Sequence, residues 1–282
     1  MSRNISPLIE VKELSTLSLN KNLVIVHAGN GEDAKSYYDE EHLDGALFVD
    51  LNTQLSDIKQ NVSVGGRHPL TSNKLFSKTL TGLGITKESH VVIYDDKNGA
   101  NAASRFWWML RSVGHKKVQV LNGGIQEAKK EGYPINSKAE TVGKTEVYKV
   151  GEWNLPQAHL KEVETASQNK NYIIIDVRES DRYNGLHEPI DLIAGHIPNA
   201  VNVPFASNLD SNGLFMPPND LKDKYQNVFG NISTDKIVVH CGSGVTACHT
   251  LLAIDYAGLE MPKLYVGSWS EWSRNNKTMV TG

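Results

Sequence analysis

The sequence predicts an α/β protein made of two copies of one domain, each a parallel sheet flanked by helices. Three observations lead to this prediction. Short β-branched runs alternate with helical segments along the chain. The motifs of the first half return in the same order in the second half. Finally, 282 residues are enough for about two domains of ordinary size.

The first half alternates strands with helices. Its apolar runs of four or five residues are typical of buried parallel strands, and its helical segments end close to Gly84, Gly114 and Gly132. Residues 53–70 are polar and predict a long loop, and loops of that length are usually functional or mobile. The predicted strands span 23–27, 46–50, 91–94 and 118–121, and the predicted helices span 73–83, 100–113 and 125–131, with a turn or short helix at 37–44.

A polar stretch, residues 134–156, separates the two halves and contains one alternating run at 145–150. We interpret it as the connection between domains. The predicted organisation is therefore a first domain over residues 1–138, a linker over 139–156 and a second domain over 157–282.

The second half repeats the first, which indicates a tandem duplication. One difference separates the copies: Asp95 stands where the second copy has Cys241. A carboxylate cannot perform thiol chemistry, so the first domain is expected to be an inactive partner of the second. The matching segments are 23–27 with 172–176, 41–46 with 195–200, 91–95 with 237–241, and 123–128 with 267–272.

Cys241 is the predicted reactive group. It lies between a β-branched run at 236–239 and a predicted helix at 248–257, at the edge of the sheet where open α/β folds bind ligands. Gly242 and Gly244 allow a tight loop whose N–H groups, with the helix N-terminus, favour a thiolate. A buried structural cysteine would not explain the following Gly-Ser-Gly. Cys248, in contrast, falls on the apolar periodicity of the helix and is expected to be structural.

Composition excludes several classes of function. A net charge of -3 gives no sign of nucleic-acid or acidic-membrane binding, and no apolar run approaches the length of a membrane helix. The N-terminal residues lack the apolar core of a signal peptide, and two cysteines do not make a disulfide framework. The ten histidines lack metal-ligand spacing. A free reactive thiol fits a reducing cytoplasm, where we expect the protein to act.

The motifs together resemble the two-domain rhodanese family, and within it the mercaptopyruvate type. The most specific motif is CGSGVTA at residues 241–247, because the thiosulfate type has Arg or Lys at the second and third positions. The resemblance covers nearly the whole chain. Supporting motifs are DVR at 176–178, RY at 182–183, GHIP at 195–198, NVPF at 202–205 and GSWSEW at 267–272.

The resemblance implies ping-pong sulfur transfer through a persulfide on Cys241, without a metal or organic cofactor. A small-molecule sulfur donor, 3-mercaptopyruvate or thiosulfate, would supply the sulfur, and a thiol such as thioredoxin, or cyanide in an assay, would accept it. Arg182 matches an arginine that binds the donor carboxylate. His68 matches a histidine that would move a proton together with Ser243. The loop positions expected to bind substrate are Gly242, Gly244, Val245 and Thr246.

The sequence departs from the family pattern at two of these positions. A second carboxylate-binding arginine normally follows a Glu-Pro pair, but here Glu188-Pro189 is followed by Ile190. Arg67 is a candidate to replace it. The acidic partner of the catalytic histidine appears as Asn52. The first departure leaves thiosulfate open as an alternative donor, and the second leaves the triad of the family incomplete.

Three other interpretations compete with this one. A cysteine phosphatase needs an arginine six positions after the cysteine, where this chain has Ala247. A rhodanese-like module that only binds a partner would not need to retain Cys241 with its loop. A thiosulfate sulfurtransferase would use the same chemistry, but a compact dianion benefits from loop cations, which Gly242 and Ser243 do not supply.

Overall fold

The structure is a computed structural model that describes residues 5–143 and 145–282. The chain divides into two compact units. The first contains residues up to Asp57, Thr71–Asn154 and Ser211–Leu214, and the second contains Ile58–Leu70, Leu155–Asp210 and Phe215–Gly282. The second unit therefore includes a segment from the first half of the chain, which the continuous boundaries predicted from sequence do not anticipate.

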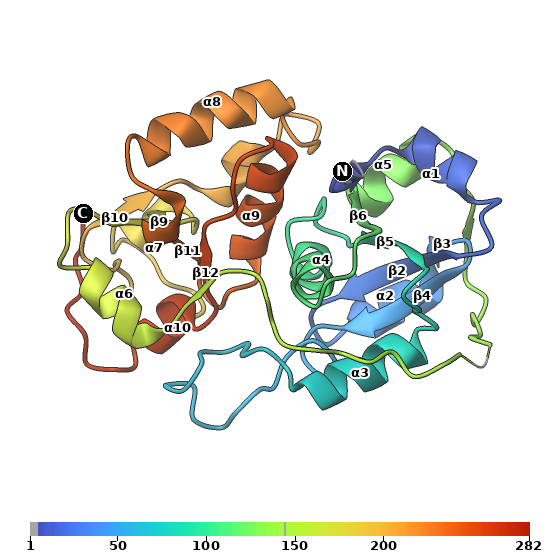
Figure 1. Cartoon of the computed structure of the whole chain (residues 1–282), viewed down its shortest axis with the longest axis horizontal. Helices are drawn as coiled ribbons and strands as arrows, with labels where there is room; N and C mark the ends of the chain where they lie inside the picture. The colour runs from blue at the N-terminus through green and yellow to red at the C-terminus, as the bar shows by residue number, and fades with distance from the viewer. Residues whose placement is uncertain (1–4, 144) are drawn as a thin grey trace. The chain divides into compact units, whose positions relative to one another are not determined.

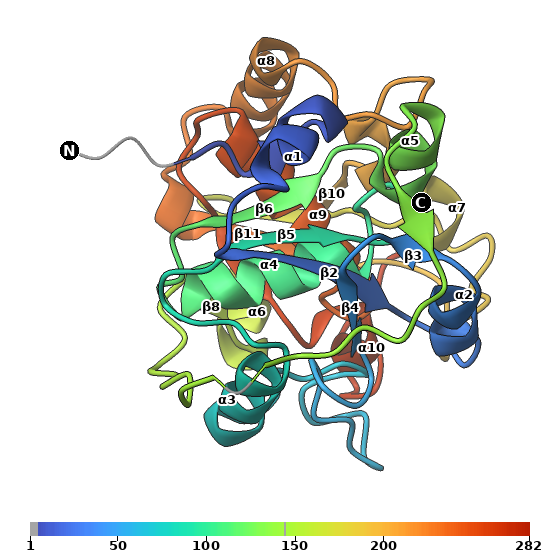
Figure 2. The same cartoon turned by 90° about the vertical axis from the view of Figure 1, so that its right-hand side faces the viewer.

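The first unit is a five-stranded sheet in the order β1-β6-β5-β2-β4, with every neighbouring pair parallel. Helices α1 and α5 lie on one side of the sheet and α3 and α4 on the other (Figures 1 and 2). The strands are β1 (Leu8–Ile9), β2 (Leu23–Gly29), β4 (Ala46–Asp50), β5 (His90–Tyr94) and β6 (Val118–Leu121), and a small antiparallel pair joins β3 (His42–Leu43) to β7 (Ile135–Asn136). The helices are α1 (Val11–Leu17), α2 (Ala34–Glu40), α3 (Asn73–Gly82), α4 (Ala102–Ser112) and α5 (Gly124–Lys130).

The second unit repeats this topology, with all pairs parallel in the order β10-β9-β11-β12-β8. Each strand occupies the place of its counterpart in the first unit, so the duplication extends to the order of the sheet. The strands are β8 (Gln157–Ala158), β9 (Ile173–Asp176), β10 (Ala200–Asn202), β11 (Ile237–His240) and β12 (Lys263–Tyr265). The helices are α6 (Leu160–Ala166), α7 (Ser180–Tyr183), α8 (Pro218–Phe229), α9 (Thr246–Tyr256) and α10 (Ser268–Trp272), with 3-10 turns η1 (Phe205–Asn208) and η2 (Thr234–Lys236).

Burial explains why these runs form strands. In the first unit, β5 and β6 contribute residues to apolar layers on both faces, and all four residues of β6 are buried. In the second unit, all four residues of β11 are buried as well. The core of this unit contains three large side chains, Tyr265 at the end of β12 and Trp269 and Trp272 on α10. Each of them is no more than 1% exposed. Burying apolar surface on this scale is the main favourable contribution to folding.

The segment predicted to be a linker instead packs on the first unit, as far as residue 154. Tyr148 is 2% exposed, its N–H donates to Thr81 Oγ1 at 3.0 Å, and its carbonyl accepts from Ser77 Oγ at 2.6 Å. These bonds connect the segment to α3, and residues 145–150 form no strand.

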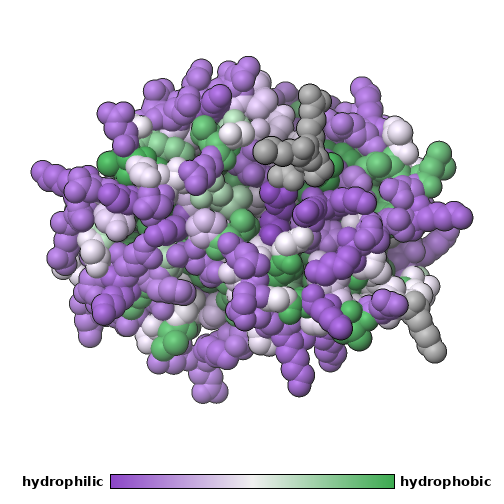
Figure 3. Space-filling view, viewed as in Figure 1, coloured by the Kyte–Doolittle hydropathy of each residue, from purple (hydrophilic) through white to green (hydrophobic). Residues whose placement is uncertain are grey.

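The surface shows no extended apolar area on the face in view (Figure 3), as expected from a sequence without long apolar runs. On the face drawn in Figure 3, hydrophilic side chains predominate and apolar ones lie in small scattered groups. Among the residues that the structure describes, no helix has the length and apolar character needed to cross a membrane.

Candidate active site

Cys241 follows directly after β11, and α9 begins five residues later at Thr246. The loop between them turns back so that the N–H of Gly244 donates to Cys241 Sγ at 3.1 Å. Gly244 has φ +74, and a Cβ there would lie 2.5 Å from the carbonyl oxygen of Val266, so only glycine fits. The N–H and the following helix N-terminus stabilise negative charge on the sulfur.

Helix α10 supports this loop from behind. Ser268 Oγ accepts from the N–H of Cys241 at 3.2 Å. The N–H of Trp269 donates to the carbonyl of Cys241 at 3.0 Å, and the N–H of Ser270 donates to the carbonyl of Gly242 at 2.9 Å. The sequence marked the segment 267–272 only as a repeated segment and as a motif that supports the family resemblance. Its role in positioning the loop was missed because backbone hydrogen bonds leave no compositional signal.

Cys248 lies on the inner side of α9 and is 0% exposed. Its Sγ donates to the carbonyl of Gly244 at 3.3 Å. This bond ties the helix to the turn that faces the nucleophile. The contact indicates a structural role for Cys248, in contrast to the chemical role predicted for Cys241.

His68 and Ser243 meet in the second unit, where a hydrogen bond of 2.8 Å joins His68 Nδ1 to Ser243 Oγ. The chain segment that carries His68 is bound to α10. The N–H of Gly65 donates to Glu271 Oε1 at 2.7 Å, and the N–H of Arg67 donates to Ser270 Oγ at 3.0 Å. A proton relay between His68 and the catalytic loop is therefore geometrically available. Asn52 belongs to the first unit.

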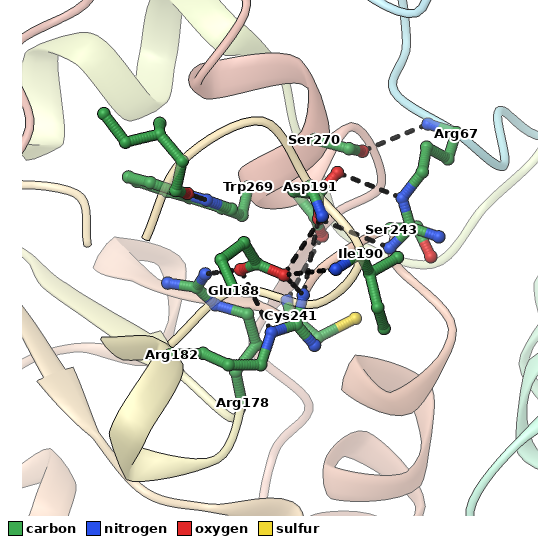
Figure 4. Close-up of polar contacts among 12 residues, drawn as sticks. Arg67, Arg178, Arg182, Glu188, Ile190, Asp191, Cys241, Ser243, Trp269 and Ser270 are labelled. Carbon is green, nitrogen blue, oxygen red and sulfur yellow. Dashed lines mark hydrogen bonds and ion pairs between the residues drawn. The ribbon is translucent and has the colours of Figure 1, made fainter. Parts of the chain in front are cut away.

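Arg182 lies in α7, which follows β9, the neighbour of β11 in the sheet. Glu188 holds its guanidinium with two bonds, from Nε to Oε2 at 3.1 Å and from Nη2 to Oε1 at 2.8 Å. Burial by itself raises the pKa of Glu188, but the bonds from Arg182 and from backbone N–H groups outweigh burial and lower this pKa. Glu188 thus stays ionised and fixes the orientation of Arg182 (Figure 4).

Arg67 and Arg182 approach the same point beside the nucleophile. A Cβ built on Gly242 would lie 2.9 Å from Arg67 Nη2 and 3.2 Å from Arg182 Nη2. A side chain at this position would meet the ends of both guanidiniums, which would have to move to make room for it. Ile190, at the position of the missing arginine, is 54% exposed.

Arg178 supports the site from a deeper layer. It forms a buried ion pair with Asp176, with Nη2 and Oδ2 2.6 Å apart, and lies 4.6 Å from the ring centroid of Trp269. Burial raises the pKa of Asp176, but His240 and Arg178 outweigh burial and lower it. Because Trp269 binds the carbonyl of Cys241, this pair stabilises the base of the loop.

The remaining predicted loop residues lie where the chain turns into the helix. Val245 is the N-cap of α9 and Thr246 is its first residue, two positions before the helix start expected from sequence. Within residues 5–143 and 145–282, no group of three or more His, Cys, Asp or Glu side chains is arranged to hold a metal ion.

Comparison with known proteins shows what the chain resembles. The sequence profile of the rhodanese-like domain matches residues 10–131 and 159–275. A probable 3-mercaptopyruvate sulfurtransferase from Pseudomonas aeruginosa is 38% identical over 241 residues, covering 83% of this chain and 82% of the relative. Thiosulfate sulfurtransferase from Rattus norvegicus is 36% identical, with 86% and 80% covered. The crystal structure of SseA from Escherichia coli, described as a 3-mercaptopyruvate sulfotransferase of rhodanese fold, superposes with a TM-score of 0.79 at 31% identity, covering 94% of this chain and all of that one.

Proposed function

This chain belongs to the rhodanese family and is a sulfurtransferase, and we propose that it takes sulfur from 3-mercaptopyruvate onto Cys241. The observation that carries the proposal is the geometry at Gly242. Two guanidinium nitrogens from different segments lie beside the residue that follows the nucleophile. A planar carboxylate can accept parallel bonds from such donors.

In the first half-reaction, Cys241 thiolate attacks the sulfur of the donor. The new S–S bond makes a persulfide, and the C–S bond breaks with its electron pair going to carbon. The thiol proton of the donor is transferred to that carbon, which yields pyruvate. The hydrogen-bonded pair of His68 and Ser243 is placed to carry this proton.

In the second half-reaction, an acceptor thiolate attacks the outer sulfur of the persulfide. The S–S bond breaks and Cys241 returns as thiolate. A protein thiol such as thioredoxin is our proposed acceptor, and cyanide would serve in an assay. A reactive, unpaired thiol fits a reducing compartment, so we propose a cytoplasmic location.

Thiosulfate is the second candidate donor, because the thiosulfate sulfurtransferase from Rattus norvegicus, at 36% identity, is nearly as similar as the probable 3-mercaptopyruvate sulfurtransferase, at 38%. Steady-state rates with both donors on one preparation distinguish the two. We expect a higher kcat/KM with mercaptopyruvate. A higher kcat/KM with thiosulfate would overturn the proposed donor while leaving persulfide chemistry intact.

Arg182 provides a more specific test of carboxylate binding. Losing a hydrogen bond to a charged group costs about 1.5–3 kcal/mol, so Arg182→Ala should lower kcat/KM for mercaptopyruvate roughly 10- to 150-fold. Arg182→Lys keeps the charge but not the planar fork, and should recover only part of this loss. Both variants must keep the native melting temperature. Unchanged kinetics in Arg182→Ala would remove this residue from the donor site.

A further inference from the structure

Asp191 is a buried carboxylate at the centre of an arginine cluster. Its side chain is 0% exposed. It binds three arginines from separate segments: Arg67 Nε at 3.1 Å, Arg274 Nη1 at 3.0 Å and Arg182 Nη2 at 3.4 Å. Figure 4 shows Arg67 reaching from its loop toward this carboxylate, with Arg182 nearby. Neither the loop motif nor the spacing of charges in the sequence pointed to Asp191.

The turn that carries Asp191 is itself fixed. Glu188 Oε1 accepts from the N–H of Asp191 at 3.0 Å and from the N–H of Ile190 at 3.1 Å. The carboxylate is therefore held in one place rather than sampling solvent. Arg274 connects this cluster to the surface, since it lines a cavity of about 490 Å³ together with Leu192.

Asp191 also borders the point where the donor would bind. A Cβ on Gly242 would lie 3.5 Å from Asp191 Oδ2, close to the two guanidinium nitrogens described above. The site thus presents Arg67 and Arg182 to an incoming anion while a fixed negative charge lies beside them. In a partly buried site, such a charge acts strongly on any further ion.

Building on the proposed function, we infer that Asp191 is a specificity-determining residue that selects singly charged donors over dianions. It cancels part of the positive potential of Arg67, Arg182 and Arg274 at Gly242. The remaining potential suits one carboxylate, as in mercaptopyruvate. Thiosulfate carries a second negative charge, which Asp191 repels and which no loop cation compensates, because Gly242 and Ser243 are neutral.

The inference predicts opposite effects for two substitutions. Asp191→Asn removes the negative charge and should raise the ratio of kcat/KM for thiosulfate to that for mercaptopyruvate at least tenfold. Arg274→Gln removes a positive charge from the other side of Asp191 and should lower this ratio. The matched control is Glu179→Gln, which removes an acid 56% exposed and 3.6 Å from Arg182 Nη1. Solvent screens that pair, so the ratio should change less than about twofold.

Inhibition provides a readout that does not depend on which donor the enzyme uses. Sulfate and pyruvate serve as the dianion and monoanion probes. In Asp191→Asn, the inhibition constant of sulfate should fall at least tenfold relative to that of pyruvate, and in Arg274→Gln it should rise. If mercaptopyruvate proves a poor donor, the proposed function fails, but this comparison of probes still decides the role of Asp191.

A purely structural role predicts a different pattern. If Asp191 only holds the arginines in place, both substitutions should weaken both donors and both probes in parallel, and the ratios should not move. That result would overturn the inference. Melting temperatures identify a variant that fails to fold. If Asp191→Asn fails to fold, the inference is tested by Arg274→Gln alone. The measured quantity is then the direction in which the ratio of kcat/KM for thiosulfate to that for mercaptopyruvate changes.

Discussion

The two strand-loop-helix elements at β5–α4 and β11–α9 occupy equivalent places in their sheets but enclose different side chains. In the first unit, Asp95 is 0% exposed and its carboxylate accepts four backbone N–H groups, from Lys97, Gly99, Asn101 and Ala103, at 2.8–3.1 Å. In the second unit, Cys241 Sγ accepts the N–H of Gly244. The fold supplies an anion-binding loop twice, and the residue at its base decides whether the loop is structural or reactive.

The loops also differ in what surrounds them. Asp95 satisfies the donors of its own loop, so the carboxylate works as an internal ligand. Around Cys241, arginines and the hydrogen-bonded pair of His68 and Ser243 are the groups that we propose act on an external molecule. The two loops therefore differ in the residue at the strand end, in the loop that follows it, and in the segment 58–70, which belongs to the second unit although it lies in the first half of the sequence.

The largest expected effect concerns the residue at the base of the reactive loop. Cys241→Ser should abolish sulfur uptake, because a serine oxygen cannot form a persulfide. Intact mass after incubation with donor should show one added sulfur in the wild type and in Cys248→Ser, and none in Cys241→Ser. Uptake that depends on Cys248 instead would invert the roles assigned to the two cysteines.

The segment 58–70 is tested next. His68→Gln and Ser243→Ala should each lower kcat/KM about 100-fold if the pair carries a proton, since general acid–base catalysis contributes at least that much. Because the two residues share one hydrogen bond, the double variant should be little worse than either single variant. Strictly multiplicative losses would show that they act independently.

Replacing one oxygen of the Asp95 carboxylate by an amide nitrogen tests its role as the internal ligand of the first unit. Asp95→Asn keeps the shape but points amide hydrogens at N–H donors, and should lower the free energy of unfolding by about 3 kcal/mol. Denaturant titration followed by fluorescence measures this loss. Asp96→Asn is the matched control, because the side chain of Asp96 is 45% exposed and should change stability by less than about 1 kcal/mol. Equal stability of the two variants would refute the internal-ligand interpretation.

The smallest expected effect is a pH dependence that belongs to the first unit. Burial lowers the pKa of His27 to about 4. Its folded-state pKa lies below the unfolded value, so the stability it contributes is complete above about pH 6.5 and is lost as the pH falls toward 4. Between pH 7 and pH 5 this amounts to about 2 kcal/mol.

His27→Phe should reduce this loss, because the ring packs among Tyr38, Phe48 and Tyr94 and phenylalanine can fill its place without titrating. The measurement is the melting temperature of wild type and variant at pH 7 and pH 5. An identical drop in both proteins would exclude His27 as its source.

Much of this architecture was readable in the sequence. The strands β4 and β6 have the bounds that the apolar runs predicted, and β11 begins one residue later than expected. The two-residue strands β1 and β8 were missed, since two residues are too few to show a period. Short helices such as α7 and α10 were missed for the same reason.

The sequence by itself determined the duplication, the alternation of strands and helices, and the reactive thiol on its glycine loop, because each depends on residues adjacent in the chain. The family resemblance also indicated His68, Ser243 and Arg182, but the tertiary structure decided how these side chains are held and added Asp191 to them. His68 and Ser243 are 175 positions apart, and Arg67 and Asp191 are 124 positions apart. Local periodicity carries no information about such pairs. They exist because the 58–70 segment and the turn at Asp191 pack on one sheet edge, which only the folded chain brings together.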